Sequence, residues 1–351
     1  MKSILILHFR PPKLYPPLLN FISILDERKI PYKLITAEKY NYKNAIVVRL
    51  FNVLKFFLIG NTHALYQKGP IICIESISTI GLFASNFLIR KQKVYFHYHE
   101  YFSNDEYKRE SFLERLGHKF ERIILKRALW VSHTNQDRLN MWALENQHVN
   151  PKILRVLPNY PPSNWLKRIE TQNNTNNIIK LVHIGSLSEK TMYLNELLDR
   201  FGSNNRFTID FYSHEFTQEV LDVIRLHNNC VIKGSINYYD IPKLKGLYDI
   251  GLVIYKGLSL NVKYSAPNKI FEYLALDLDV WCSDKLLSAK VLQRIDCYPK
   301  IIMVDFENLE QFDVAEARNF SGIPYIPSPY TLESVITKRL DFFHIKLKNI
   351  K

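Results

Sequence analysis

The stretch from Tyr264 to Leu276, which reads YSAPNKIFEYLAL, says most about the fold. Pro267 suits the start of a helix, because the first helical turn leaves its N–H groups unbonded and proline has none to lose. The residues after Pro267 are good helix formers, and the apolar run Val280-Trp281-Cys282-Ser283 follows. A helix followed by a short buried strand indicates a sheet that is covered by helices.

Short apolar runs and helical stretches alternate on both sides of this segment. In the rest of the second half they cover residues 180–184, 193–201, 208–212, 219–226, 230–233, 241–248 and 250–255. In the first half they cover residues 3–7, 18–26, 32–35, 45–48, 53–58, 71–74, 79–88, 93–97 and 129–132. This alternation predicts an α/β protein with two Rossmann-like, doubly wound parallel sheets facing across a cleft, and ligands beyond the carboxyl ends of the strands.

Between the two series, residues 155–162 read RVLPNYPP, and the prolines suit neither a helix nor a central strand. We interpret this segment as a hinge, with a polar loop at residues 172–177 after it. The first domain is therefore expected at residues 1–158 and the second at residues 159–330. Residues 331–351 have apolar side chains near helical spacing and predict a terminal helix that packs back towards the first domain.

The helix start at Pro267 has the chemistry to hold a nucleoside diphosphate. Free backbone N–H groups and the positive end of the helix dipole attract phosphate there, and Lys269 adds a formal charge. Glu272 lies one turn further on, where its carboxylate can accept hydrogen bonds from both hydroxyls of a ribose.

This segment resembles the family 4 type of GT-B glycosyltransferases, whose C-terminal domain has a Pro-Asn-Lys-hydrophobe-Phe-Glu-Tyr-hydrophobe-Ala sequence before a short strand. In that family, the glutamate that matches Glu272 binds the ribose of the donor. Residues 156–159, 182–186 and 232–236 also match at suitable separations. The resemblance implies a hexosyltransferase that moves a sugar from a nucleotide diphosphate sugar to a polysaccharide or lipid-linked glycan, with retention of configuration. It also implies no bound metal or other cofactor, because positive side chains and helix dipoles stabilise the departing diphosphate.

The expected donor-binding residues come from these segments. A glycine after a strand, such as Gly185, lets the backbone approach phosphate, and Lys190 either supplies a countercharge or is solvated. The sequence departs from the family at Tyr264, where many members have a second glutamate, and at Asp277 and Asp279, which replace a glycine and a proline. The whole expected set is Gly185, Ser186, Lys190, Lys233, Gly234, Ser265, Pro267, Asn268, Lys269 and Glu272.

In the first half, residues 96–101 read FHYHEY at the end of an expected strand. They resemble the His-Glu or His-Asp that family members have near the transferred sugar, which makes His99 and Glu100 the expected catalytic residues. A histidine can hydrogen-bond a sugar hydroxyl, and a neighbouring carboxylate can orient it or bind the acceptor. The alternatives for His97 and His99 are a zinc site or a structural pair. The family's Gly-rich acceptor loop is replaced by FRPPK at residues 9–13, which leaves the acceptor side unassigned.

The chain has 351 residues and a net charge of +13, which favours an anionic partner or reflects a solvated basic surface. Basic and apolar residues recur at helical spacing over residues 100–127, which predicts a helix that rests on anionic lipid or faces solvent. Residues 71–89 are almost as apolar as a membrane span, but Glu75 and small polar residues favour a buried strand and helix. Scattered cysteines and the lack of a signal peptide indicate a cytoplasmic protein, either free or peripheral at the inner face of the membrane.

Two other functions fit parts of this pattern. A nucleotide-sugar epimerase can use the same architecture, because a fold does not determine a reaction. A non-catalytic nucleic-acid-binding protein would explain the charge, but the sequence has no recognisable nucleic-acid-binding motif, so no nucleic acid is expected as a partner.

Overall fold

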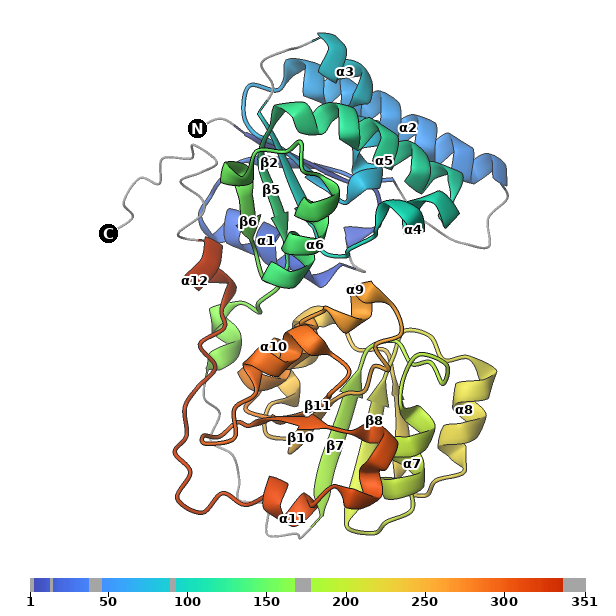
Figure 1. Cartoon of the computed structure of the whole chain (residues 1–351), viewed down its shortest axis with the longest axis vertical. Helices are drawn as coiled ribbons and strands as arrows, with labels where there is room; N and C mark the ends of the chain where they lie inside the picture. The colour runs from blue at the N-terminus through green and yellow to red at the C-terminus, as the bar shows by residue number, and fades with distance from the viewer. Residues whose placement is uncertain (1–2, 13–14, 38–45, 89–92, 168–177, 337–351) are drawn as a thin grey trace. The chain divides into compact units, whose positions relative to one another are not determined.

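The computed structural model describes residues 3–12, 15–37, 46–88, 93–167 and 178–336. The chain divides into two compact units (Figure 1). The described residues of Met1–Asn159 and Leu332–Lys351 form the first unit, and those of Tyr160–Thr331 form the second. Each unit is built on a sheet of six strands. The expected α/β class, with two Rossmann-like parallel-sheet domains, is thereby confirmed.

All neighbouring strands of the first sheet run parallel, in the order β2-β1-β3-β4-β5-β6. Strands β1 and β3, in the interior of this order, are buried along their whole length, which is typical of a parallel sheet with both faces covered. The strands are β1 (Ile4–His8), β2 (Tyr32–Ile35), β3 (Ile71–Ile74), β4 (Val94–Tyr98), β5 (Ala128–His133) and β6 (Leu154–Val156).

Helices cover both faces of this sheet. One core contains Phe56 of α2, Ile124 of α5 and Trp142 of α6, and a separate core contains Leu18 of α1 and Leu332 of α12. The helices are α1 (Pro16–Glu27), α2 (Ile46–Tyr66), α3 (Phe83–Leu88), α4 (Asn104–Arg109), α5 (Phe112–Ile124), α6 (Gln136–Glu145) and α12 (Leu332–Ile336), with 3-10 helices η2 (Ser76–Gly81), η3 (Leu125–Arg127) and η4 (Pro151–Ile153).

The second sheet is also parallel, in the order β12-β11-β10-β7-β8-β9. Its strands are β7 (Ile179–Ile184), β8 (Phe207–Tyr212), β9 (Cys230–Gly234), β10 (Ile250–Val253), β11 (Asp279–Ser283) and β12 (Ile301–Val304). The α-helices are α7 (Leu194–Phe201), α8 (Gln218–Arg225), α9 (Leu260–Lys263), α10 (Asn268–Ala275) and α11 (Val314–Ala317). The 3-10 helices are η5 (Ser163–Leu166), η6 (Tyr238–Leu244), η7 (Leu287–Leu292) and η8 (Phe306–Gln311).

The separate apolar run expected at residues 45–48 is wrong, because residues from Ile46 onward belong to the long helix α2. The apolar residues there continue at helical spacing without a turn signal. Gly60 is tolerated inside this helix, since a Cβ at that position would lie 2.5 Å from the carbonyl oxygen of Gly81 in η2. The glycine therefore allows α2 to pack closely on η2.

Three further expectations need correction. The single helix over residues 100–127 is two helices, because Ser103 caps α4 and Ser111 caps α5. Residues 241–248 do not form an α-helix; most of the 3-10 helix η6 lies there, with Pro242 inside it. The segment interpreted as a hinge from residue 155 begins inside strand β6, which pairs with β5, and neither β6 nor β12 was expected as a strand.

The apolar stretch at residues 71–89 contains β3, η2 and α3, so a strand and a helix do occur there. Within the described residues, no helix is both long enough and apolar enough to cross a membrane. The terminal helix is described as far as Ile336, and the remainder of the predicted segment, residues 337–351, lies outside the described residues, as does the polar loop at residues 172–177.

Asp277 and Asp279, which depart from the family pattern, have structural roles in the second unit. Asp277 has a φ of 60° directly after α10, and its carboxylate pairs with Lys245 at 2.9 Å. Asp279 is fully buried, and it accepts hydrogen bonds from the backbone of Lys300 and from Arg318. Ion pairs of these two aspartates, with Lys245 and Arg318, thus hold the segment that follows α10.

Candidate active site

The first residues of α10 lie beside the turn that follows β7. Gly185 has a φ of +140°, a conformation that side chains other than glycine rarely adopt, and a Cβ built there would lie 4.0 Å from Cε of Lys269. The backbone N–H of Ile184 donates to the hydroxyl of Tyr273 on α10 at 2.9 Å. The helix and the turn after β7 are therefore fastened together.

Lys269 and Glu272 form an ion pair at this point, with Nζ 2.5 Å from Oε2. Glu272 is only 2% exposed, whereas the Lys269 side chain remains 19% exposed. A helix start with a partly exposed lysine, next to a glycine turn, combines free N–H groups with positive charge. This arrangement has the chemistry to bind a diphosphate.

The remaining expected donor residues have different surroundings. Pro267 is the N-cap residue of α10 and Asn268 is its first helical residue. Ser265 is buried, and its hydroxyl donates to the carbonyl oxygen of Val262 at 2.7 Å. Ser186 and Lys190 are exposed in the segment that follows Gly185.

Lys233 and Gly234 belong to β9, at the edge of the sheet, with β8 between them and β7. Nζ of Lys233 pairs with Asp210 at 3.1 Å, and Gly234 has a φ of +75°. These two residues thus lie two strands away from β7, the strand that Gly185 follows.

The sheet of the first unit has a second polar cluster at its carboxyl edge. His8 ends β1, Glu75 follows β3, His99 follows β4 and His133 ends β5. Because β1, β3, β4 and β5 are consecutive neighbours in this sheet, their ends bring these side chains to one edge.

Glu75 joins two parts of this cluster. Its Oε1 accepts a hydrogen bond from the hydroxyl of Tyr15 at 2.5 Å and another from the backbone N–H of His99 at 2.8 Å. The ring of Tyr15 lies against the rings of His8 and His99, with centroids 4.5 Å and 4.4 Å away. The expected residue His99 is therefore held from two sides.

The buried histidines of this edge are neutral at physiological pH. Burial lowers the pKa of His8 to about 3 and that of His97 to about 3, and it lowers the pKa of His99 well below its usual value. Within the described residues, Nδ1 of His99 has no hydrogen-bond partner. A neutral imidazole can exchange a hydrogen bond with a sugar hydroxyl, but it supplies no formal positive charge.

The metal alternative finds no support in the described part of the chain, where no three His, Cys, Asp or Glu residues are grouped to hold an ion. Nδ1 of His97 instead lies 2.9 Å from the hydroxyl of Ser132 on β5. Glu100 is partly exposed beside His99. Its charge raises the pKa of Glu75 after the larger effect of burial.

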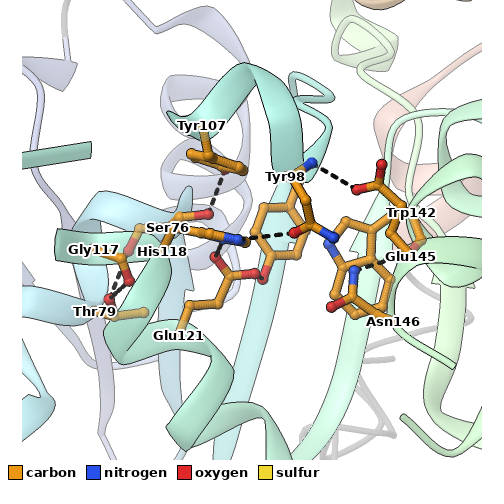
Figure 2. Close-up of polar contacts among 11 residues, drawn as sticks. Ser76, Thr79, Tyr98, Tyr107, Gly117, His118, Glu121, Trp142, Glu145 and Asn146 are labelled. Carbon is orange, nitrogen blue, oxygen red and sulfur yellow. Dashed lines mark hydrogen bonds and ion pairs between the residues drawn. The ribbon is translucent and has the colours of Figure 1, made fainter. Parts of the chain in front are cut away.

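A buried network supports the segment that follows Glu75 (Figure 2). The hydroxyls of Ser76 and Tyr107 lie 2.6 Å apart, and Thr79 donates to the carbonyl oxygen of Gly117 at 2.8 Å. A Cβ at Gly117 would lie 2.5 Å from Cα of Ile77, so glycine lets α5 pack directly on η2. These contacts keep η2, and with it Glu75, in place.

Sequence reasoning placed His8 and Glu75 at strand ends on the ligand edge of the sheet but assigned them no role, and it missed Tyr15 and Arg138 of the same unit. Arg138 of α6 is buried and donates to the carbonyl oxygen of His99. The signal for Glu75 was its position as the only charge in an apolar stretch, and the signal for His8 was its place at a strand end. Tyr15 and Arg138 gave no such signal.

No known family profile matches the sequence, and no characterised protein matches it. Solved structures do resemble it in fold. Anabaena HepE in complex with UDP-glucose is 13% identical, covers 98% of this chain and 100% of its own, and has a TM-score of 0.64. Sucrose-phosphate synthase from Thermosynechococcus elongatus is 11% identical, covers 98% of each chain, and has a TM-score of 0.66.

UDP-GlcNAc 2-epimerase from Neisseria meningitidis bound to UDP-GlcNAc is similar as well. It is 12% identical, covers 97% of this chain and 99% of its own, and has a TM-score of 0.59. At such identities the likeness shows the fold. The chain has the fold of the GT-B class, with two Rossmann-like domains.

Proposed function

We propose that this protein transfers a glycosyl group from a nucleotide diphosphate sugar to a glycan or lipid-linked acceptor. The observation that carries the proposal is the position of Gly185 next to Lys269, which is itself paired with Glu272. Similarity of fold to HepE in its complex with UDP-glucose supports a nucleotide-sugar donor.

The proposed chemistry uses this chain's own groups. Lys269 and the N-terminus of α10 stabilise the negative charge of the departing diphosphate, and Glu272 accepts hydrogen bonds from the ribose. In the first unit, His99 forms a hydrogen bond with a hydroxyl of the reacting sugar, and Glu100 orients His99 or binds the acceptor. On the basis of the family resemblance, the proposal also includes transfer of a hexosyl group with retention of configuration and without a metal ion.

The first test is thermal stabilisation by UDP, GDP, ADP and CMP, because a ligand that binds only the folded state raises the melting temperature. The stabilising nucleotide then identifies the sugar donors to assay with glycan and lipid-linked acceptors. Nucleotides that leave the melting temperature unchanged, together with no transfer from any donor, would reject the proposal.

An epimerase is the second candidate, and the fold of the Neisseria enzyme favours keeping it. An epimerase converts its nucleotide sugar without an acceptor, whereas a transferase releases nucleoside diphosphate at a rate that depends on an acceptor. Product analysis with and without acceptor therefore separates the two activities.

We also propose that the first unit contacts anionic membrane from the cytoplasmic side. Helix α5 and the 3-10 helix η3 that follows it expose cations at helical spacing: Arg115, Lys119 and Arg122 of α5 and Lys126 of η3. Helix α2 exposes an apolar row in which each side chain is more than half exposed: Leu50, Phe51, Leu54 and Leu58. Both helices, labelled in Figure 1, pack against η2. Basic and apolar rows on two helices that pack against the same segment suit a surface that lies on anionic lipid.

A further inference from the structure

Glu75 has the most unusual backbone of the first unit. Among the described residues, Lys29, Glu75 and Asp277 are the non-glycine residues with positive φ. Lys29 and Asp277 follow the ends of α1 and α10, where such a conformation is common. Glu75 instead lies between β3 and η2 with φ 61° and ψ 155°, a region that is essentially restricted to glycine.

The surrounding contacts hold this strained conformation in place. The backbone N–H of Glu75 donates to the carbonyl oxygen of His97 at 3.1 Å, and its own carbonyl oxygen accepts from the N–H of Ser78 at 3.1 Å. The hydroxyl of Ser76 is bonded to Tyr107, which stacks on His118 with ring centroids 4.0 Å apart. A backbone conformation that is costly and yet fixed on all sides is found mainly where function needs it.

This backbone conformation places the Glu75 carboxylate so that one of its oxygens accepts hydrogen bonds from two separate segments of the chain. Oε1 accepts from Tyr15, which precedes α1, and from the backbone of His99, which follows β4. Tyr15 in turn lies with its ring against His99, 4.4 Å between centroids. If this oxygen of Glu75 were removed, the hydroxyl of Tyr15 and the backbone N–H of His99 would both lose their hydrogen-bond acceptor.

We propose that Glu75 is a positioning residue, which fixes Tyr15 and His99 at the carboxyl edge of the first sheet by accepting a hydrogen bond from each. The inference rests on the proposed function of His99 and adds the group that orients it. Glu75 acts through His99, and no proton transfer to or from the sugar is assigned to it.

The charge state of Glu75 follows from the groups around it. Burial raises its pKa to about 7, the charge of Glu100 adds to this, and Tyr15, the backbone of His99 and Arg10 oppose it. Other groups that face it are Tyr107 of α4 and Arg138 of α6. Because an ionised carboxylate accepts hydrogen bonds more strongly than a neutral carboxyl, the hold on His99 tightens as the pH rises through neutrality.

Substitutions at position 75 separate positioning from proton transfer. Glu75→Gln keeps an oxygen acceptor, so we expect its turnover to match that of the wild type at acidic pH and to lack the rise near pH 7. Glu75→Ala removes the acceptor, and we expect a turnover at least tenfold lower with an unchanged donor KM. Glu114→Gln, which alters another partly buried carboxylate of the same unit, should keep the wild-type pH profile.

Glu75→Gly is the control for a folding defect in Glu75→Ala, because glycine adopts a positive φ without strain. We expect it to melt above Glu75→Ala and to show the same loss of turnover. Wild-type turnover in a folded Glu75→Ala or Glu75→Gly variant would overturn the inference. A Glu75→Gln variant as inactive as Glu75→Ala would also overturn it, because it would indicate proton transfer by Glu75.

Two readouts do not need activity. Infrared difference spectra of the wild type against Glu75→Gln should show a carboxyl group that titrates near neutral pH and shifts in Tyr15→Phe. The imidazole NMR signals of His99 should move in Glu75→Ala and return towards wild type in Glu75→Gln.

If both results appear but no sugar is transferred from any donor, the positioning of His99 stands and the proposed function fails. Unchanged His99 signals in Glu75→Ala would reject the positioning itself.

Discussion

Nζ of Lys269 lies 2.5 Å from Oε2 of Glu272, so the two charged groups of the candidate donor site form one ion pair. Glu272 is almost fully buried, which means that its carboxylate depends on this lysine for compensation. The cation and the carboxylate are therefore coupled, although we assign them to different parts of the donor.

This coupling gives the first prediction. Glu272→Ala should weaken the nucleoside and the nucleoside diphosphate alike, because a lost hydrogen bond to a charged group costs about 1.5–3 kcal/mol, roughly tenfold or more in affinity. Lys269→Ala should weaken the diphosphate more than the nucleoside. Calorimetric titration of each variant with both ligands measures the two effects.

The matched control is Lys243→Ala, which removes another lysine three residues from its carboxylate partner, Asp240, in an exposed pair at 2.6 Å. We expect this variant to bind both ligands like the wild type. Equal losses for the two ligands in Lys269→Ala would argue against a phosphate contact, and a folded Glu272→Ala with unchanged affinity would remove Glu272 from the site.

The second prediction concerns His99. His99→Ala should reduce turnover more than donor affinity, because the proposed partner of the imidazole is the reacting sugar. Since burial keeps the pKa of His99 well below its usual value, its own ionisation should leave no step in the pH profile between pH 6 and 8. Steady-state kinetics test the first statement, and a pH profile of Glu75→Gln, which lacks the rise expected from Glu75, tests the second. Normal turnover in His99→Ala would assign the residue a structural role.

The third prediction is a loss of stability in acid. Burial lowers the pKa of His8 and His97 to about 3 and that of His183 to about 4, and it lowers those of His99 and His133 well below the usual value. Between these values and the ordinary 6.5, the unfolded chain binds protons that the folded chain does not. Stability is therefore complete above pH 6.5 and is lost as the pH falls, by up to about 1.4 kcal/mol per pH unit for each histidine.

Three carboxyl groups oppose this trend: Glu75, Asp279 and Glu114, whose pKa burial also raises. The pKa of Glu75 is raised to about 7 and that of Asp279 to about 6, in both cases mainly by burial, so each favours the folded state at low pH and loses that contribution as the pH rises. The histidines outnumber them, and the net free energy of unfolding should fall from pH 6 to pH 4. Urea titrations at several pH values measure the slope, which His8→Gln should reduce by about one proton. A slope of zero would contradict the neutral state of these histidines.

Sequence alone could predict most strands of the two sheets and the helical half of the candidate donor site, because both depend on local pattern. Lys269 and Glu272 are three residues apart on one helix, so their pairing follows from helical spacing. The contact of Gly185 with Lys269 does not follow, since it needs the neighbouring positions of β7 and β10 and the path of the chain between them.

The cluster around Glu75 shows the same limit more strongly. Tyr15, Glu75 and His99 come from distant parts of the sequence and meet because β1, β3 and β4 are adjacent in the sheet. The strain at Glu75 is equally invisible in sequence, because a glutamate after a strand ordinarily has an extended backbone. The error at residues 45–48 has a local cause, since β-branched residues there favour a strand until the whole of α2 is considered.

The fourth prediction is reversible binding of the protein to anionic vesicles through α2 and α5. Each basic residue near an anionic surface contributes about 1 kcal/mol, so the four exposed cations of α5 and η3 are enough for measurable binding. The attraction should weaken as salt rises, because ions screen the charges, and neutral vesicles should bind poorly. Vesicle flotation at several salt concentrations measures these effects.

Two sets of substitutions separate the charged and apolar parts of this surface. Reversing Lys119, Arg122 and Lys126 to glutamate should abolish binding to anionic vesicles, whereas Phe51→Ser with Leu54→Ser should weaken binding and leave its salt dependence intact. Leu226→Ser, at an exposed leucine of the second unit, is the control and should bind like the wild type. Binding that survives the charge reversal, or that ignores salt, would mean that the basic face of α5 is only solvated. Loss of self-association in the Phe51 and Leu54 variant, without any change in vesicle binding, would instead identify the apolar row of α2 as a contact between two copies of the chain.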